Sequence, residues 1–517
     1  MGKPDADQKV VVIGAGIGGL CAAIRLALSG LSVTLLEAQA APGGKMRALP
    51  SSAGPVDAGP TVLTLRSVFD ALFAAAGERL EDHVTLIPQP ILARHFWPDG
   101  SQLDLFTDPD QNAAAIRAFA GPGAERDFRR FNRLSAALYR SFDAPMMQSP
   151  EPRLPGILLN ALAAPAIWPA LSRSLAGQLK ASFSDPRLRQ LFGRYATYVG
   201  GTPDLAPGVL ALIWQAEARG VWAVQGGMQN LALALAGLAA RRGVAIRCNT
   251  VVSRILTRNG HVTGLALRDA PPMDCDAVVF NGDPAALADG LLGAGAQQGT
   301  EPSATQPRSL SACVWSFAAT PSSVPLIHHN VFFCTDPARE FGPIATGRLP
   351  DEATLYVCAQ DRAGQPPTGP ERFEIIMNAP PNATISAQEV AECRARTFPH
   401  LARFGLTFDP PPPDHGLTTP ADFSQLFPGS QGSLYGRSPH GTLASFQRPT
   451  ARTSLPGLYL AGGGAHPGAG VPMAALSGKH AAEAILTDLT SAQSSRRTGM
   501  HGGMSMVSRL TGRAPSL

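Results

Sequence analysis

The sequence is short of charged residues. Asp, Glu, Lys and Arg make up 16% of its 517 residues, whereas about a quarter is usual in soluble proteins. A low charge content indicates a large apolar pocket or a membrane-facing surface, and it also arises in a genome that favours Ala, Gly, Pro and Arg. Composition leaves these explanations open. The formal net charge of +4 gives no indication of a nucleic-acid partner, and none is expected.

The sequence also has no closely spaced cysteine pairs. The seven cysteines are scattered, odd in number and without a CxxC pair. This pattern argues against a disulfide framework and against a zinc site, so no metal is expected, and it is typical of a reducing compartment. No signal peptide is expected, because the first apolar run is itself a nucleotide-binding strand.

A glycine fingerprint follows that first strand and opens an apolar helix. Gly14 permits a tight turn, Gly16 lets a pyrophosphate approach the backbone, and Gly19 lets helix and strand pack closely. Gly18 belongs to the same expected contact set. The helix N-terminus offers free N–H groups and a positive dipole. A second strand then ends at Glu37, which can accept hydrogen bonds from both ribose hydroxyls, so the whole pattern predicts dinucleotide binding.

Further glycine turns recur along the chain. Gly44 and Lys45, after Gly43, suit a loop that crosses back over a pyrophosphate, and residues 59–61 are expected to approach a flat ring system. Near the C-terminus, a strand again meets a glycine-rich turn and a helix N-terminus, whose dipole can stabilise negative charge at one edge of a reduced flavin. Met473 has core packing as its alternative role. The remaining expected cofactor contacts are Gly59, Pro60, Thr61, Val252, Gly462, Gly463, Gly470, Val471, Pro472 and Met473.

Nucleotide-type elements therefore occur at the beginning, middle and end of the chain. The middle one begins at Gly226 and includes Asn259 and Gly260, a strong hairpin signal between alternating apolar residues. Apolar spacing predicts helices over 71–220, and β-rich runs predict an antiparallel sheet over 310–380. The expected divisions are a discontinuous nucleotide-binding domain at 1–70, 221–290 and 450–490, a substrate and membrane-associated domain at 71–220 and 291–449, and a disordered tail at 491–517.

Residues 154–172 carry no charge but contain three prolines, which would break a helix lying in lipid. They predict either an element lying in the membrane interface or a buried layer lining a pocket. Upstream, an amphipathic helix is expected, with Phe128, Phe131 and Leu138 on one face and four arginines on another. Those arginines face solvent or anionic headgroups, and they are Arg126, Arg129, Arg130 and Arg133.

The split arrangement resembles the flavoprotein amine-oxidase and phytoene-desaturase superfamily, because a nicotinamide dehydrogenase normally keeps its cofactor domain contiguous. Residues 43–45, 57–61 and 460–468 look like motifs of the bacterial carotenoid desaturases, and the resemblance covers about 10–486. A narrower resemblance is to the hydroxyneurosporene desaturases, also called 1-hydroxycarotenoid or methoxyneurosporene 3,4-desaturases. The segments that carry it are 328–333, 356–362, 378–380, 434–436 and 470–473.

The resemblance implies an α/β fold with a split Rossmann-type FAD-binding domain and an inserted domain of antiparallel sheet plus helices. It implies an FAD-dependent oxidoreductase that removes two hydrogens from C3–C4 of an acyclic 1-hydroxycarotenoid in spheroidene or spirilloxanthin biosynthesis, with hydride transfer to flavin N5. It also implies a peripheral protein on the cytoplasmic side of the inner or intracytoplasmic membrane, with oxygen or a quinone as electron acceptor. Where the family commonly has Arg, Lys45 keeps the charge but loses the bidentate geometry.

The sequence indicates few candidate catalytic residues. His328 and His329 are adjacent on an expected strand, so their side chains should point to opposite faces, and a satisfied core histidine is the alternative for either. Asp361 and Arg362 are expected to form a structural ion pair or to meet the hydroxyl end of the substrate. No nucleophile–base arrangement is evident.

Other functions remain open at this point. Phytoene desaturase is the nearest alternative among the desaturases. A carotenoid isomerase on the same fold needs reduced FAD but consumes no net oxidant. A non-catalytic lipid-binding relative, similar in architecture to the Rab GDP-dissociation inhibitors, is a third possibility, although all the fingerprint glycines and Glu37 are present here.

Overall fold

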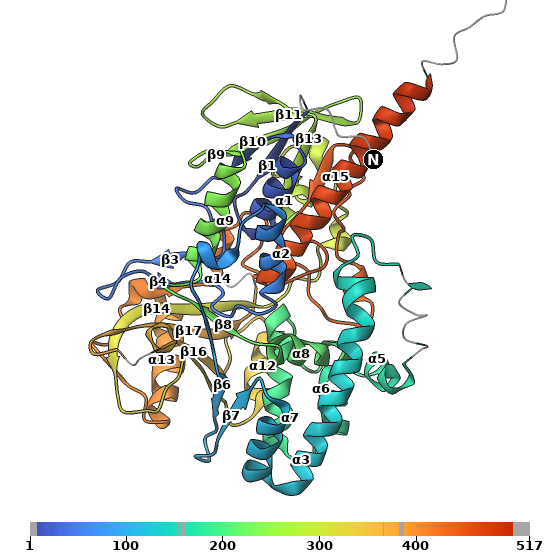
Figure 1. The fold of residues 1–517 in the computed structure, drawn as a ribbon. Helices are drawn as coiled ribbons and strands as arrows, with labels where there is room; N and C mark the ends of the chain where they lie inside the picture. The colour runs from blue at the N-terminus through green and yellow to red at the C-terminus, as the bar shows by residue number, and fades with distance from the viewer. Residues whose placement is uncertain are drawn as a thin grey trace, which may run out of the picture.

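The computed structural model describes residues 8–153, 155–156, 162, 164–364, 367–381 and 387–499. Two sheets organise these residues. A parallel sheet with helices lies at one end of the molecule, and a larger mixed sheet with a group of helices lies at the other (Figure 1). The chain passes between the two ends several times.

The parallel sheet is built from three separate parts of the chain. In spatial order its strands are β20 (Leu458–Leu460), β13 (Ala277–Phe280), β1 (Lys9–Ile13), β2 (Ser32–Leu36) and β9 (Ala245–Arg247). All pairings are parallel. Because both faces of such a sheet are covered, its central strands are continuous apolar runs, and β1 and β13 are almost entirely buried.

Helices cover one face of this sheet and a small antiparallel sheet covers the other. The helices are α1 (Ile17–Leu28), α9 (Gln229–Arg241) and α15 (Val471–Gly499), and the antiparallel strands are β10 (Val252–Arg258), β11 (His261–Leu267) and β12 (Met273–Asp274). Val10 and Val12 pack towards the helices, whereas Val11 packs towards the small sheet, as the two-residue period of a strand requires. The hairpin predicted at Asn259 and Gly260 is confirmed, and both residues have positive φ.

The second sheet is mixed and mostly antiparallel. Its order is β18 (Phe408–Asp409), β14 (Ser311–Pro321), β17 (Glu371–Ala379), β16 (Leu355–Ala359), β15 (His329–Phe332), β6 (Ile91–Phe96) and β7 (Gln102–Phe106), with β19 (Leu417–Thr418) paired to β14. The antiparallel sheet predicted over 310–380 is therefore confirmed.

The two faces of the second sheet have different neighbours. Trp315 and Phe317 of β14 stack edge-on against Phe398 of α13 (Ala387–Arg403), with ring centroids 5.0 and 6.2 Å away. On each strand, the side chains at alternate positions point to the opposite face of the sheet. On that face Ile376 of β17 and Tyr356 of β16 line a large cavity. One face of the sheet thus forms a core with α13, and the other forms the floor of the cavity.

A helical insertion lies beside the second sheet (Figure 1), and its side chains line the other side of the cavity. In the amphipathic helix predicted around Arg126, the side chains of Phe128, Phe131 and Leu138 are buried and the four arginines are exposed, as expected. The insertion contains α3 (Pro109–Phe142), α5 (Trp168–Ser172), α6 (Leu175–Ser182), α7 (Pro186–Gly193) and α8 (Ile213–Ala218), together with the 3₁₀ segment η4 (Arg194–Val199).

Shorter elements connect these parts. The strands are β3 (Ala48–Leu49) paired with β4 (Val56–Asp57), and β5 (Leu86–Pro88) paired with β8 (Trp222–Val224). The remaining helices are α2 (Ser67–Ala75), α10 (Pro284–Ala288), α11 (Ala294–Gln297), α12 (Pro337–Ala345) and α14 (Pro420–Leu426).

Two expectations from the sequence are wrong. Residues 71–220 are not all helical, because β6 and β7 form a hairpin around the turn at Asp99 and Gly100, and β6 joins the second sheet. The apolar residues of β6 and β7 alternate with a two-residue period, which was mistaken for helical spacing in the sequence. The tail expected to be disordered from 491 is helical as far as Gly499, at the end of α15. Residues 500–517, and residues 154, 157–161 and 163 of the predicted interface element, lie outside the described residues.

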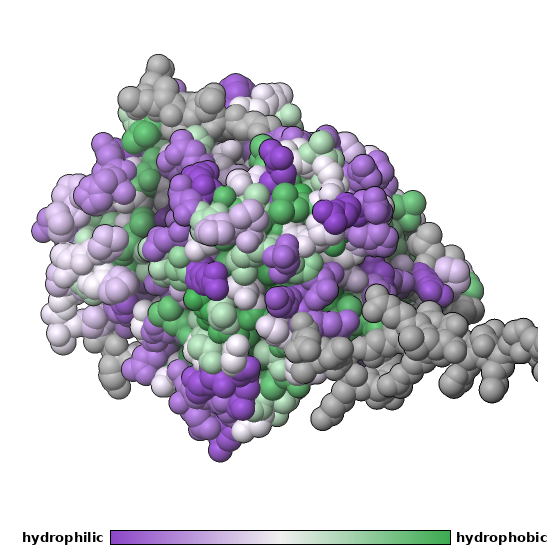
Figure 2. All heavy atoms as spheres, turned by 90° about the horizontal axis from the view of Figure 1, so that it is seen from above, coloured by the Kyte–Doolittle hydropathy of each residue, from purple (hydrophilic) through white to green (hydrophobic). Residues whose placement is uncertain are grey.

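Within the described ranges, the helices are all too short or too polar to cross a bilayer. At the end where the parallel sheet lies, hydrophilic side chains alternate with small hydrophobic areas on the surface seen from above (Figure 2). The described residues visible in this view form no broad apolar face.

Candidate functional site

The site is built first at the carboxyl edge of the parallel sheet, where β1 runs into α1. Gly14 has φ of +95°, which favours glycine. A Cβ on Gly19 would lie 2.1 Å from the carbonyl oxygen of Gly14, and one on Gly16 would lie 3.0 Å from Nδ2 of Asn281. No side chain caps the N-terminus of α1, so its first N–H groups remain available to an anion.

Glu37 closes the next edge position, after β2. Its side chain is buried, with Oε2 accepting from the N–H of Ala15 at 2.7 Å and Oε1 accepting from the N–H of Gln39 at 2.9 Å. Each carboxylate oxygen can accept a second bond, so the ribose role predicted for Glu37 is compatible with these contacts. Thr250 donates its N–H to the Glu37 carbonyl, which brings Val252, the first residue of β10, to the same edge.

The second glycine loop lies on the first. The N–H of Gly43 donates to Ala15, and Gly43 forms a parallel bridge with Gly16. A Cβ on Gly59 would lie 1.9 Å from the carbonyl oxygen of Lys45. Residues 59–61 can therefore run over residues 43–45 only because position 59 lacks a side chain. Pro60 and Thr61 then reach the wall of the cavity.

The C-terminal glycine turn completes the same edge. Gly462, with φ of +102°, follows β20 and donates its N–H to Ser477 Oγ at 2.7 Å. A Cβ on Gly18 would lie 2.6 Å from the Gly462 nitrogen. Gly470, Val471 and Pro472 also line the cavity, whereas Met473 is absent from its lining among the described residues.

These residues fit FAD. Four strand ends converge on one edge, where positions that tolerate no Cβ leave backbone N–H groups accessible to a pyrophosphate. Asn281, at the end of β13, donates to the Gly14 carbonyl at 3.0 Å, and its buried Oδ1 has no partner within the described chain. Loops 59–61 and 470–472 both open into the cavity, as a site for a ring system that meets a substrate requires.

Two buried cations stand beside this edge. Lys45 Nζ donates to the Leu434 carbonyl at 2.5 Å, and burial lowers the pKa of Lys45 to about 8. It lies over the ring of Phe427 at 5.4 Å, so it points towards residues 427–434. Arg448 is more deeply buried than Lys45, and burial lowers its pKa to about 10. It donates to the carbonyls of Gly463, Tyr435 and Arg437, at 2.9, 2.9 and 2.7 Å.

Asp57 connects the cofactor loops to the second sheet. Its carboxylate accepts from the N–H of Met228, with distances of 3.1 and 2.8 Å to its two oxygens, and its carbonyl accepts from Ser316 Oγ at 3.0 Å. Burial raises the pKa of Asp57 to about 6 and that of neighbouring Glu374 well above its usual value. This polar group holds residues 57–61 in place over the sheet.

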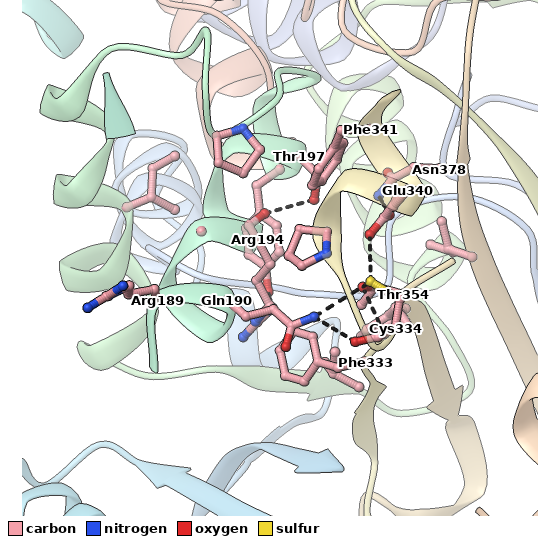
Figure 3. Close-up of a pocket in the computed structure, with 18 of the residues that line it drawn as sticks. Arg189, Gln190, Arg194, Thr197, Phe333, Cys334, Glu340, Phe341, Thr354 and Asn378 are labelled. Carbon is pink, nitrogen blue, oxygen red and sulfur yellow. Dashed lines mark hydrogen bonds between the residues drawn. The ribbon is translucent and has the colours of Figure 1, made fainter. Parts of the chain in front are cut away.

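A cavity of about 760 Å³ extends from these loops between the second sheet and the helical insertion (Figure 3). Its walls are largely apolar, with Ile376 and Val331 on the sheet and Leu179 and Ile213 on the helices. Exposed charged residues, among them Asp99, Lys180 and Asp204, mark where it opens to the surface. An elongated apolar ligand fits such a space.

A chain of hydrogen bonds leaves the cavity at Thr61. Its Oγ1 lies 2.7 Å from the Tyr356 hydroxyl, which lies 2.6 Å from Nδ1 of His329. Burial, with the nearby charges of His328 and Arg194, lowers the pKa of His329 well below its usual value. His329 is therefore a neutral acceptor at neutral pH.

The two histidines lie together, so the expectation that they point to opposite faces is wrong. Their ring centroids are 4.4 Å apart, because His328 lies just before β15 and does not share its alternation. His328 Nε2 lies 3.7 Å from Cys358 Sγ. The three residues can offer three ligand atoms within 4.8 Å of one another, one fewer than a structural zinc site takes.

Asp361 and Arg362 do not pair with each other. Arg362 binds Glu371 through two bonds, at 2.6 and 2.7 Å, and Asp361 binds Arg372. Neither residue is among those that line the cavity. Both therefore fasten β17 to the turn after β16, and the substrate contact considered for them finds no support in this geometry.

Several residues of the site carried no clear sequence signal. Asn281 follows a recognisable strand, and its position at the strand end was the available clue. Tyr356 and Tyr435 fell inside family-like segments without an assigned role. Arg448 and Glu340 had no signal, because they reach the site through tertiary packing of distant segments.

Comparisons with known proteins agree with this reading of the site. The family model described as flavin-containing amine oxidoreductase matches residues 17–486. A hydroxyneurosporene desaturase of Cereibacter sphaeroides is 63% identical over 486 residues, which cover 93% of this chain and 98% of that protein. A lycopene-forming phytoene desaturase of Pseudescherichia vulneris is 32% identical, covering 93% of this chain and all of that protein.

The fold also matches solved structures. An oxidoreductase of Methanosarcina mazei superposes with a TM-score of 0.57 at 18% sequence identity, covering 92% of this chain and 100% of the other. At this identity the match supports the fold alone.

Substitution of Glu37 by Gln should weaken FAD binding. Gln keeps the size but loses the charge, and a charge-assisted hydrogen bond contributes about 1.5–3 kcal/mol. The variant should therefore bind FAD roughly ten- to hundredfold more weakly than the unchanged protein. The amount of FAD that each purified protein retains measures this difference. The control is Glu483→Gln, which removes an exposed carboxylate on α15 that pairs with Lys479. Equal FAD affinity in the two variants would contradict the role of Glu37.

Proposed function

We propose that the chain, which belongs to the flavin-containing amine oxidoreductase family, is a carotenoid desaturase acting on an acyclic 1-hydroxycarotenoid. The observation that carries this proposal is the apolar cavity that opens directly onto the cofactor loops at Thr61 and Gly470. The name of the 63% identical relative, hydroxyneurosporene desaturase, supports the substrate class. The reaction removes one hydrogen from C3 and one from C4 and leaves a double bond between them.

Bound FAD supplies the acceptor for the hydride that leaves the allylic carbon. Residues 14–19, Glu37, 43–45, Asn281 and 462–463 would hold it, with loops 59–61 and 470–472 beside the cavity. The apolar walls hold the polyene and exclude water, so positioning and desolvation provide most of the catalysis. Loss of a hydride leaves a positive charge spread along the polyene, which makes the proton on the adjacent carbon acidic.

The chain offers an acceptor for that proton. Thr61 Oγ1 can take it at the cavity wall while the Thr61 hydroxyl proton shifts to Tyr356 and the Tyr356 proton to Nδ1 of His329. Because the departing proton is acidic, a weakly basic buried histidine is sufficient. The balance is one hydride to the cofactor and one proton to His329, with oxygen or a membrane quinone later taking the electrons.

The alternatives differ in a measurable way. A phytoene desaturase would accept a substrate without a hydroxyl, and the phytoene desaturase compared here is only 32% identical. An isomerase would leave the substrate mass unchanged. A lipid-binding protein would bind pigment without converting it.

Expression in a carotenoid-free bacterium, supplied in parallel with phytoene, neurosporene and 1-hydroxyneurosporene, should separate these activities. The expected result is a product lighter by two hydrogens, with a red-shifted absorption spectrum, from the hydroxylated substrate only. Extraction followed by mass spectrometry measures this. Conversion of phytoene would contradict the substrate class, and unchanged mass with all three pigments would contradict desaturation.

Substitution of Tyr356 by Phe should interrupt the proton chain. The rate of conversion is expected to fall about a hundredfold, the lower end of what general acid–base groups contribute, while FAD content stays normal. Tyr435→Phe is the matched control, since Tyr435 also lines the cavity and its hydroxyl makes no hydrogen bond to the described residues. Equal single-turnover rates in the two variants, followed by product extraction over time, would contradict the relay.

A membrane surface is the proposed source of the substrate. Four large apolar side chains with 49–61% exposure occur on α5 and nearby loops: Leu162, Trp168, Leu205 and Leu443. The Leu205 carbonyl accepts from the N–H of Gly441, so two of these loops are joined. Exposed Arg173 and Lys180 lie in the adjoining segments, as binding to anionic headgroups requires. The proposed location is the cytoplasmic face of the inner or intracytoplasmic membrane.

The triple change Trp168→Ser, Leu205→Ser and Leu443→Ser should abolish flotation with vesicles of phosphatidylcholine and phosphatidylglycerol. Its control is the double change Leu233→Ser and Leu291→Ser, which removes leucines of 44% and 52% exposure on other elements. The control should float like the unchanged protein. Equal flotation of both variants would contradict a membrane-binding surface at α5.

A further inference from the structure

A polar cluster interrupts the apolar lining of the cavity on the side of the second sheet. Glu340, Asn378, Thr354 and Cys334 face one another there (Figure 3). Asn378 Nδ2 donates to Glu340 Oε1 at 2.8 Å, and the Cys334 thiol lies 3.8 Å from Glu340 Oε2. This cluster plays no part in binding FAD or in the proton chain.

Three elements bring these side chains together. Glu340 lies in the first turn of α12, which begins at Pro337 after the N-cap Asp336. Asn378 lies near the end of β17, two positions after Ile376 on the same face of the strand. Thr354 lies immediately before β16. The strand alternation that places Ile376 on the cavity floor therefore also points Asn378 into the cavity.

Glu340 is unusual among the buried carboxyls of the cavity. It is 2% exposed, and within the described residues no Lys, Arg or His lies within ion-pair distance of it. Glu217, in the same lining, is instead paired with Arg194 at 3.3 Å. Burial raises the pKa of Glu340. The carboxyl accepts from Asn378, from the backbone and side chain of Thr354 and from the Cys334 thiol. The thiol is a weak donor, so a substrate hydroxyl can take its place.

We propose that Glu340, oriented by Asn378, receives the tertiary hydroxyl of the substrate and selects hydroxylated carotenoids over those with a plain isoprenoid end. This inference rests on the proposed function. Either protonation state of the carboxyl serves it, because a carboxylate accepts from an alcohol and a carboxylic acid donates to one. A site built around a substrate hydroxyl rejects the analogue that lacks it, since the buried polar group is then left unpaired.

The position of the cluster agrees with the position of the reacting bond. Only C2 separates the carbon that carries the hydroxyl from C3, so the hydroxyl partner must lie close to the cofactor loops. Thr354 lies two residues before Tyr356, an advance of about 7 Å along a strand, and Tyr356 contacts Thr61 of those loops. A hydroxyl at Glu340 therefore places C3 and C4 towards Thr61 and leaves the polyene to extend along the cavity.

Other polar groups of the cavity are less suited to this role. Asp99, Lys180 and Asp204 are exposed to solvent at its opening, where water competes for a hydroxyl. Arg194 is engaged by Glu217 and by Tyr198. Glu340 combines burial, the absence of an ion-pair partner within the described residues and a weak thiol contact that a hydroxyl can replace.

The test compares Glu340→Gln and Glu340→Leu with the unchanged holoenzyme on 1-hydroxyneurosporene and neurosporene. Glu340→Leu should lower kcat/KM for the hydroxylated substrate about a hundredfold or more, and it should raise retention of neurosporene by the purified protein. Glu340→Gln should keep most of the activity, because its amide still bonds a hydroxyl. The control Glu352→Gln changes a buried carboxylate that pairs with Arg339 and Arg403, outside the cavity lining, and should preserve the substrate preference.

The outcomes separate this inference from the proposed function. If the unchanged enzyme fails to convert 1-hydroxyneurosporene, the proposed function is wrong. If it converts that substrate and Glu340→Leu, with normal FAD content, keeps the same preference between the two pigments, the role of Glu340 is overturned. If Glu340→Leu misfolds and lacks FAD, the same comparison is made with Asn378→Leu and Thr354→Val, which change neighbouring residues of the cluster. An unchanged preference between the two pigments in both variants overturns the inference.

Discussion

The whole structure depends on how closely α1, α15 and the strand ends approach one another. A Cβ on Gly478 of α15 would lie 2.2 Å from the carbonyl oxygen of Gly18, and one on Gly18 would lie 2.6 Å from the nitrogen of Gly462. Glycine at these positions lets the first and last parts of the chain share one sheet edge. Because the same positions leave N–H groups uncovered, the packing that joins the split domain also creates the place where a dinucleotide binds.

Asp57 extends this constraint to the second sheet. It is held by Met228 from the parallel-sheet domain and by Ser316 from the second sheet, so residues 57–61 cannot move independently of either. The cofactor loops therefore form one end of the cavity, and the sheet forms its floor. The apolar floor suits a polyene, and the polar cluster at Glu340 orients a hydroxylated ligand in the cavity. The hydroxyl end of such a ligand has a partner in the cluster, and its other end does not.

The sequence predicted the parts of this arrangement that local chemistry specifies. Gly14, Gly16 and Glu37 are recognisable because a strand, a tight turn and a helix need them in that order. Other predictions were wrong. Helix was expected where the β6–β7 hairpin lies, but β6 pairs with the distant strand β15. His328 and His329 were expected on opposite faces, but β15 begins only at His329. Glu340 and Arg448 are ordinary charged residues until tertiary packing buries them beside the site, and no spacing in the sequence announces that.

The central claim is that a hydroxylated carotenoid in this cavity loses two hydrogens, one as a hydride to a flavin held at the edge of the parallel sheet and one as a proton to the protein. The most direct measurement is a single turnover without oxygen or any other acceptor, with 1-hydroxyneurosporene in excess over the purified holoenzyme and the extracted pigments quantified against bound FAD. The account predicts conversion of the substrate up to one molecule of desaturated product per bound flavin. Absence of any product under these conditions, in an enzyme that still retains its FAD, would contradict it.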